Sequence, residues 1–145
     1  MKIIIVFSFV FTSLLAQDLI ITSNVILKDT TLVLNGNLII KDGGSLTLNK
    51  AAININCQYE GQYSAHIDTS GSFIMLNNSE LSTTENGSKY AFVCQGREFK
   101  MQNSILSGAG WGVFEELQGY PDDGTKGPFF TSVKTFIDSS EIKQC

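Results

Sequence analysis

Few side chains of this sequence could act as an acid, a base or a nucleophile. His66 is the only histidine and Arg97 the only arginine, so a Ser/His/Asp or Cys/His site would have to use His66. Arg97 stands beside Glu98, and an exposed pair of this kind contributes only about 0 to 1 kcal/mol. The sequence therefore assigns no catalytic residue and favours a protein that is not an enzyme, while leaving enzymatic activity open.

The three cysteines, Cys57, Cys94 and Cys145, do not have the close spacing of a metal site. Their number is odd, so one thiol is left over or pairs elsewhere. Two interpretations stay open: a disulfide between Cys57 and Cys94, or buried structural thiols, which the sequence favours. We predict no metal site from these residues.

Aromatic and acidic side chains gather in residues 108–128, a segment with both prolines, six of the 13 glycines and the only tryptophan. Aromatic rings stack on sugar faces, while carboxylates bind hydroxyl groups or calcium, so calcium is the one cofactor that the sequence allows. In the alternative interpretation these rings fold back onto the domain. The candidate ligand-binding residues are Trp111, Tyr120, Glu115, Glu116, Asp122 and Asp123.

Two sequence motifs have the form of an N-glycosylation acceptor, which matters only in a eukaryotic source. They begin at Asn77 and Asn86. Asn77 belongs to a recurring turn described below, so Asn86 is the better acceptor.

The composition describes one folded domain. The chain has 145 residues, 43% of them hydrophobic, with 10 Lys and Arg against 14 Asp and Glu. The absence of a basic run argues against nucleic acid as a partner. Many glycines but only 2 prolines indicate a β protein with tight turns.

Residues 1–16 have the pattern of a secretory signal peptide. Lys2 precedes an apolar stretch at 3–15, which is shorter than the roughly 20 residues of a membrane span. Cleavage after Ala16 would leave a domain of residues 17–145. We therefore predict a secreted or cell-surface protein with no membrane span. An uncleaved anchor or a buried strand is the alternative for this segment.

Short apolar triplets with alternating faces recur at a fixed step, separated by turn-forming clusters. Triplets 32–34 and 46–48 are 14 residues apart, and triplets 38–40 and 53–55 are 15 apart. A fixed step between very short strands indicates stacked repeats.

A longer repeat spans the middle of the chain. Residues 65–75 align with 91–101 at an offset of 26, which places Ala65 on Ala91 and Phe73 on Phe99. Residues 77–82 align with 102–107 at an offset of 25, and 138–142 supply a third copy. The step from the second to the third copy is about ten residues longer, which identifies 108–128 as an inserted loop.

These repeats resemble the pectate-lyase-like right-handed parallel β-helix proteins, in particular the repeat-bearing surface proteins of microbes. The resemblance lies in residues 38–49, 72–82 and 99–108 and extends over most of 25–142. It implies that the recurring Asn-Ser pairs sit in sharp turns, where Asn tolerates left-handed backbone and side chains stack between coils. A catalytic family member would need clustered Asp and Glu residues with calcium and a basic residue.

We therefore predict an all-β fold, a single-stranded right-handed parallel β-helix of about five coils that begins near residue 25. The competing fold is an antiparallel sandwich, for which Asn35-Gly36 would make a hairpin turn. Alternating hairpins would not require a gap-free repeat, which favours the solenoid. The predicted core consists of Leu32, Leu34, Leu46, Leu48, Ile67, Phe73, Met75, Leu81, Val93, Phe99, Met101 and Leu106.

Two functions compete on this evidence. One is a secreted or cell-surface non-catalytic protein that binds extracellular polysaccharide, and the other is the N-terminal fragment of a polysaccharide lyase or glycoside hydrolase. The unstacked acids favour the first. No capping element follows residue 142. We therefore expect either missing C-terminal coils or end-to-end association.

Overall fold

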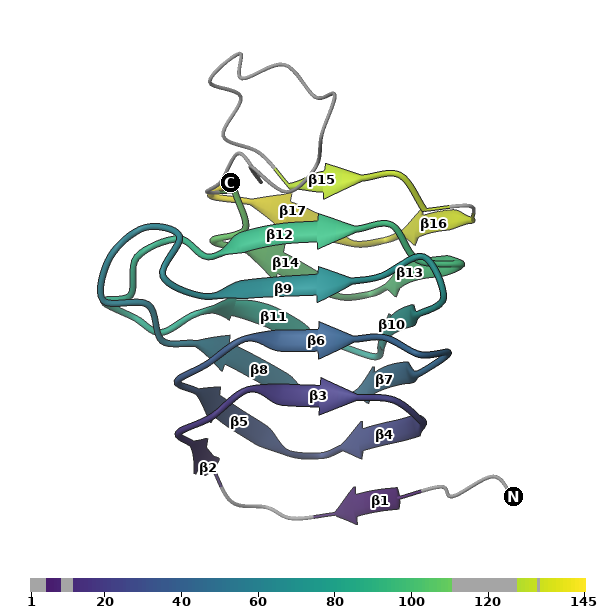
Figure 1. Ribbon diagram of the computed structural model, residues 1–145, viewed down its shortest axis with the longest axis horizontal. Helices are drawn as coiled ribbons and strands as arrows, with labels where there is room; N and C mark the ends of the chain where they lie inside the picture. The colour runs from purple at the N-terminus through teal and green to yellow at the C-terminus, as the bar shows by residue number, and fades with distance from the viewer. Residues whose placement is uncertain (1–4, 9–11, 111–127, 133) are drawn as a thin grey trace.

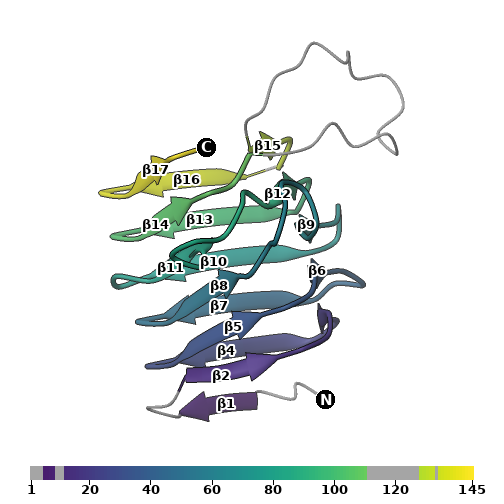
Figure 2. The same cartoon turned by 90° about the vertical axis from the view of Figure 1, so that its left-hand side faces the viewer.

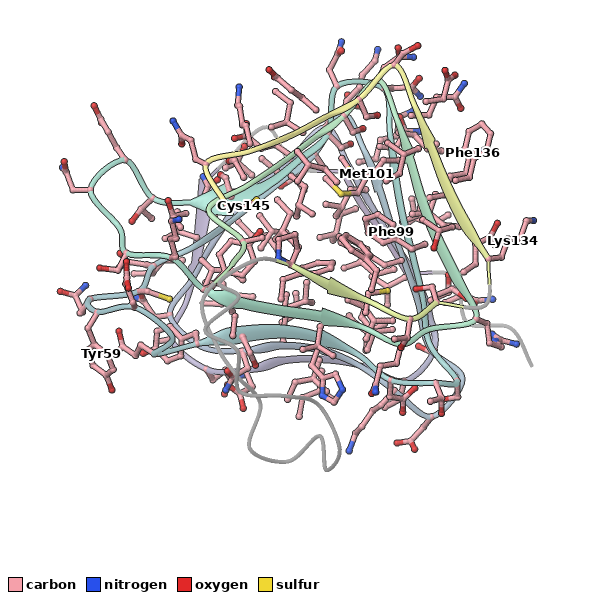
Figure 3. All side chains as sticks on the ribbon, turned by 90° about the horizontal axis from the view of Figure 1, so that it is seen from above. Tyr59, Phe99, Met101, Lys134, Phe136 and Cys145 are labelled. Atoms are coloured by element: carbon pink, nitrogen blue, oxygen red, sulfur yellow. The ribbon has the colours of Figure 1, made fainter. Side chains whose placement is uncertain are left out.

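The structure is a computed structural model that describes residues 5–8, 12–110, 128–132 and 134–145. Every regular element in these ranges is a β-strand, and every ladder between named strands is parallel. The strands form three sheets that face one another around a triangular core (Figures 1 and 3).

The chain visits sheets A, B and C in turn, so that each circuit of three strands makes one coil. Sheet A contains β1 (Ile5–Ser8), β4 (Asn24–Lys28), β7 (Ser45–Asn49), β10 (Ser72–Leu76), β13 (Glu98–Gln102) and β16 (Thr135–Asp138). Sheet B contains β2 (Thr12–Leu15), β5 (Thr31–Leu34), β8 (Ala52–Ile55), β11 (Glu80–Thr83), β14 (Ile105–Ser107) and β17 (Glu141–Lys143). Sheet C contains β3 (Leu19–Ile21), β6 (Leu38–Ile40), β9 (Ser64–Ile67), β12 (Ala91–Cys94) and β15 (Phe129–Phe130).

The winding of these coils is right-handed. The coils rise from the N-terminal end in Figures 1 and 2, and in Figure 3, where the chain rises toward the viewer, it turns anticlockwise. The predicted single-stranded right-handed parallel β-helix is confirmed. The hairpin at Asn35-Gly36 does not form, because these residues turn the chain from β5 into β6, and β5 pairs in parallel with β2 and β8.

Alternate side chains of each strand fill the interior. Phe73, Met75, Phe99 and Met101 are fully buried, and Figure 3 shows Phe99 and Met101 inside the triangle. The predicted core is confirmed for these residues, whereas Leu32 is only partly buried. Such columns of aliphatic and aromatic side chains hold neighbouring coils together by apolar burial.

Two of the predicted offsets are the real registers. Phe73 pairs with Phe99, 26 residues away, and Glu80 pairs with Ile105, 25 residues away. The third copy also follows, since Ile105 pairs with Glu141. Its longer step is explained by the predicted insertion, which falls between β14 and β15.

The register predicted for sheet C is wrong by one residue. Ala65 pairs with Phe92 and not with Ala91, so His66 pairs with Val93. A shift of one residue turns each side chain to the opposite face. Val93 is therefore buried, but it lies in the outward row of sheet C and not in the central core.

The coils also begin earlier than the predicted start near residue 25. Strands β1 and β2 lie within the predicted signal peptide and pair in parallel with β4 and β5. The alternating apolar residues of this segment suit a strand as well as a leader, and a strand was the alternative for it. Cleavage after Ala16 stays a prediction.

Candidate functional site

A polar groove runs along the corner where sheet A turns into sheet B. Its volume is about 430 Å³. Three consecutive coils contribute one tripeptide each, just before or at the start of β11, β14 and β17. We call it the corner groove; it is lined by Asn78, Ser79, Glu80, Asn103, Ser104, Ile105, Ser139, Ser140 and Glu141.

Left-handed backbone makes the sharp turns that shape this groove. The φ angles are 62° at Asn78, 47° at Asn103 and 49° at Ser139. Asn is one of the few residues that adopt this conformation readily. The predicted role of the recurring Asn-Ser pairs as turn residues is thus confirmed, and these turns repeat at the same place in successive coils.

The serine hydroxyls at the base of the groove are used to hold the coils together. Ser79 Oγ donates to the Leu76 carbonyl at 2.6 Å and accepts the Ala51 backbone amide of the preceding coil at 3.2 Å. Ser140 Oγ accepts the Ser104 backbone amide of its preceding coil at 3.1 Å. These bonds satisfy backbone groups that the turns leave without a strand partner, so the serines are structural.

Exposed amides and carboxylates remain for contact with a ligand. Asn78 and Asn103 are exposed, and their backbones form the 2.6 Å hydrogen bond from Asn78 N to Asn103 O. Glu80, Ile105 and Glu141 are aligned at the start of three adjacent strands. The half-buried Ile105 therefore separates the two acidic residues.

A cation lies beside one of these acids. Lys143 Nζ is 3.1 Å from Glu141 Oε2, and both side chains are largely exposed. Such a pair contributes little to stability. Its partner acid can exchange it for a ligand hydroxyl at small cost.

A second hydrogen-bonded turn lies at the corner between sheets C and A. Asp68 Oδ1 accepts the Ser70 amide at 2.8 Å, the Ser70 hydroxyl at 2.7 Å and the Gly71 amide at 2.9 Å. Burial alone would raise the pKa of Asp68, but these hydrogen bonds outweigh it and lower the pKa below its ordinary value. Asp68 is thus a turn-forming residue.

The six ligand-binding candidates of the inserted loop lie outside the described residues. They are Trp111, Tyr120, Glu115, Glu116, Asp122 and Asp123. The start of the loop is placed: Tyr90 N donates to Gly108 O at 3.1 Å, and Gly110 N donates to Tyr90 O at 3.0 Å. The insertion therefore leaves the solenoid at the corner between sheets B and C, away from the corner groove.

The two glycosylation candidates differ in their surroundings. Asn77 is exposed, but its side-chain Nδ2 donates to Asn49 Oδ1 at 2.9 Å within the turn stack. Asn86 is exposed in the loop between β11 and β12. Asn86 remains the better acceptor of the two.

Neither basic residue considered at the outset belongs to the groove. His66 lies in the outward row of sheet C, paired with Ile39 and Val93. The expected exposed pair of Arg97 with Glu98 is not formed, because Glu98 Oε1 lies 3.2 Å from Lys134 Nζ.

The cysteines are free thiols, so the candidate disulfide between Cys57 and Cys94 is not formed in this structure. Cys57 is bridged to Ser88 at the corner before β12, whereas Cys94 ends that strand. This spacing along sheet C is too long for a disulfide, which needs Cα atoms less than about 7 Å apart. Burial raises the pKa of all three thiols, including Cys145.

Within the described ranges, no group of three or more His, Cys, Asp or Glu side chains could hold a metal ion. In the same ranges, no helix has the length and apolar character that crossing a membrane requires.

The corner groove was not among the sites predicted from sequence. Its signal was present in the recurrence of Asn-Ser followed by Glu or Ile, which we interpreted as turn geometry alone. Comparison with known proteins offers no further guide, since no family model, curated protein or solved structure matches the chain.

Proposed function

We propose that the chain is a secreted or cell-surface β-helix protein of the pectate-lyase-like kind, without catalytic activity, that binds extracellular glycans. The observation that carries this proposal is the corner groove, a shallow polar site formed by the same turn in three successive coils. Amides and carboxylates are suited to sugar hydroxyls, because a hydroxyl both donates and accepts hydrogen bonds. A wide site of this kind fits a chain of sugars better than a small apolar metabolite.

The inserted loop provides a second contact region in this proposal. Trp111 and Tyr120 would stack on sugar rings, and the four acidic residues would bind hydroxyls or calcium. Since the loop leaves the solenoid at another corner, substitutions in the loop and in the groove test separate contacts.

The competing function is glycan cleavage, which one feature of the groove also favours. Glu80 and Glu141 are two strands apart, and strands in a sheet are spaced by about 4.8 Å. Twice this spacing is close to the upper end of the separation of about 6.5 to 9.5 Å between the carboxyl groups of an inverting glycosidase. However, Ile105 stands between them, where an attacking water would need polar partners.

A glycan array with the full-length chain, with and without calcium, tests the proposal. We expect binding to a restricted set of polysaccharides without release of reducing or unsaturated sugar ends. Binding to no glycan in either condition would refute the proposed function. Release of such ends, abolished by Glu80→Gln but not by Glu60→Gln at a distant exposed loop, would establish the enzyme instead.

The cellular location needs its own measurement. The intact mass of the exported protein should correspond to residues 17–145, with cleavage after Ala16. Retention of residues 1–16 on the exported protein would contradict the signal-peptide prediction.

A further inference from the structure

We propose that the glycan lies along the corner groove, parallel to the solenoid axis, with one sugar on each coil and no acidic sugars. This inference rests on the proposed function and specifies the ligand and its orientation.

The orientation follows from the repetition of the groove. Asn78, Asn103 and Ser139 occupy equivalent turn positions on three adjacent coils, as their positive φ angles and the register of the following strands show. Figure 2 shows these turns stacked along the axis at the ends of β10, β13 and β16. A ligand that contacts all three turns must therefore run from coil to coil.

The spacing between coils suits a polysaccharide. Neighbouring strands are about 4.8 Å apart, which is close to the length that one pyranose ring adds to an extended β-linked chain. Each sugar would then meet the same kind of turn as the sugar before it. The groove offers an amide at Asn78 and at Asn103 and a hydroxyl residue at Ser139, so it holds about three sugars.

The two sides of the groove divide the contacts by chemistry. On the sheet A side lie neutral side chains at the turn positions, and on the sheet B side lie Glu80, Ile105 and Glu141. The carboxylates would accept hydrogen bonds from hydroxyl groups of the outer sugars. Ile105 offers an apolar surface to the C–H groups of the middle sugar.

Charge decides against acidic sugars. Glu80 and Glu141 line the groove and Asp138 ends the adjacent strand β16, while the cation beside them, Lys143, is paired with Glu141. The whole chain also has a net charge of −4. A uronic acid polymer would bring its carboxylates against these acids, and like charges brought together oppose binding.

The experiment measures binding of the full-length chain to neutral β-linked oligosaccharides of one to six sugars by calorimetry, with an acidic series of equal lengths. We expect affinity to rise about tenfold per added sugar up to three sugars, the effect of one or two hydrogen bonds each, and then to level off. The acidic series should bind at least tenfold more weakly, and its binding should improve with salt.

The groove variants are Asn78→Gly and Asn103→Gly, because glycine accepts the positive φ of both positions and removes only the amide. Each should weaken binding by about tenfold with an unchanged melting temperature, whereas Asn86→Gly at the other corner should not change affinity. The double change Glu80→Gln and Glu141→Gln should reduce the discrimination against the acidic series, while Glu60→Gln should not.

The outcomes separate the two proposals. Glycan binding that both Asn→Gly variants retain in full, or that prefers acidic sugars, would overturn the groove inference and leave the proposed function standing. Binding lost only in Trp111→Ala would also overturn the inference and place the site in the inserted loop. If wild-type protein binds no glycan, the proposed function itself fails.

Discussion

Phe99 is the side chain whose removal should most weaken the contact between neighbouring coils. It is fully buried, and its ring centroid lies 6.0 Å from that of Phe73 in the preceding coil and 5.9 Å from that of Phe92. The ring of Phe130 is closer still, at 5.0 Å. Phe99 therefore connects two sheets and two coils through one aromatic cluster.

The expected cost of Phe99→Ala is about 3 to 5 kcal/mol, the usual range for a fully buried phenylalanine. Loss of three ring contacts places the value in the upper part of that range. A whole domain is stable by only about 5 to 15 kcal/mol, so the melting temperature should fall by roughly 10 °C.

Phe136→Ala is the matched control. Phe136 is 47% exposed and points away from the core in Figure 3, with Lys100 Nζ 5.5 Å from its ring centroid. Its removal should cost at most about 1 kcal/mol.

Urea unfolding measures both costs, and hydrogen exchange locates them. Because each coil contacts only its neighbours, the damage in Phe99→Ala should be local. Residues 98–143 should lose protection, while strands β4 to β8 should keep it. A loss below about 1 kcal/mol, or uniform loss of protection along the chain, would refute the view that this cluster couples the coils.

Two further predictions concern ionisable groups. Because the pKa of Asp68 is lowered by folding, its stabilising contribution is present above the ordinary aspartate pKa of about 4 and is lost as pH falls through the lower folded value. Asp68→Asn should therefore be less stable than wild type at pH 7 but similar near pH 2 in urea unfolding, and an equal difference at both pH values would contradict this. Since the pKa values of Cys57, Cys94 and Cys145 are raised by burial, native thiol alkylation at pH 7 should be slow for all three and rise with pH. Unfolding without reductant should give three labels by mass spectrometry, and a disulfide would leave one.

The sequence was sufficient to predict the fold where each strand has one apolar and one polar face. In β10 and β13, Phe73 and Met75 alternate with half-buried residues, as do Phe99 and Met101, so their register could be found by aligning apolar positions. The pattern of core residues thus determined the 26-residue offset.

The same reasoning failed for β12 because that strand is buried on both faces. Ala91, Phe92, Val93 and Cys94 are all buried, so their side chains give no alternation from which a face could be assigned. A register shift of one residue could not be detected there, and the outward position of Val93 followed only from the strand pairing.

The candidate groove was hidden for a different reason. Asn103 and Ser104 look alike in sequence as turn formers, yet in the structure Ser104 is buried and bonded while Asn103 is exposed. Exposure at a turn depends on which neighbouring coil covers it, and this cannot be read from one tripeptide.

The two corners that follow sheet B and precede it serve different purposes in this solenoid. Three long connections, at 56–63, 84–90 and 108–128, all join sheet B to sheet C. The turns from sheet A to sheet B stay short, with left-handed residues in each described coil from β4 onward. Length can vary at the first corner because the next strand resumes the same register, whereas a periodic binding surface requires that length not vary. A ligand with a regular repeat is therefore expected at the corner between sheets A and B, and one recognised by individual side chains at the corner that bears the loops.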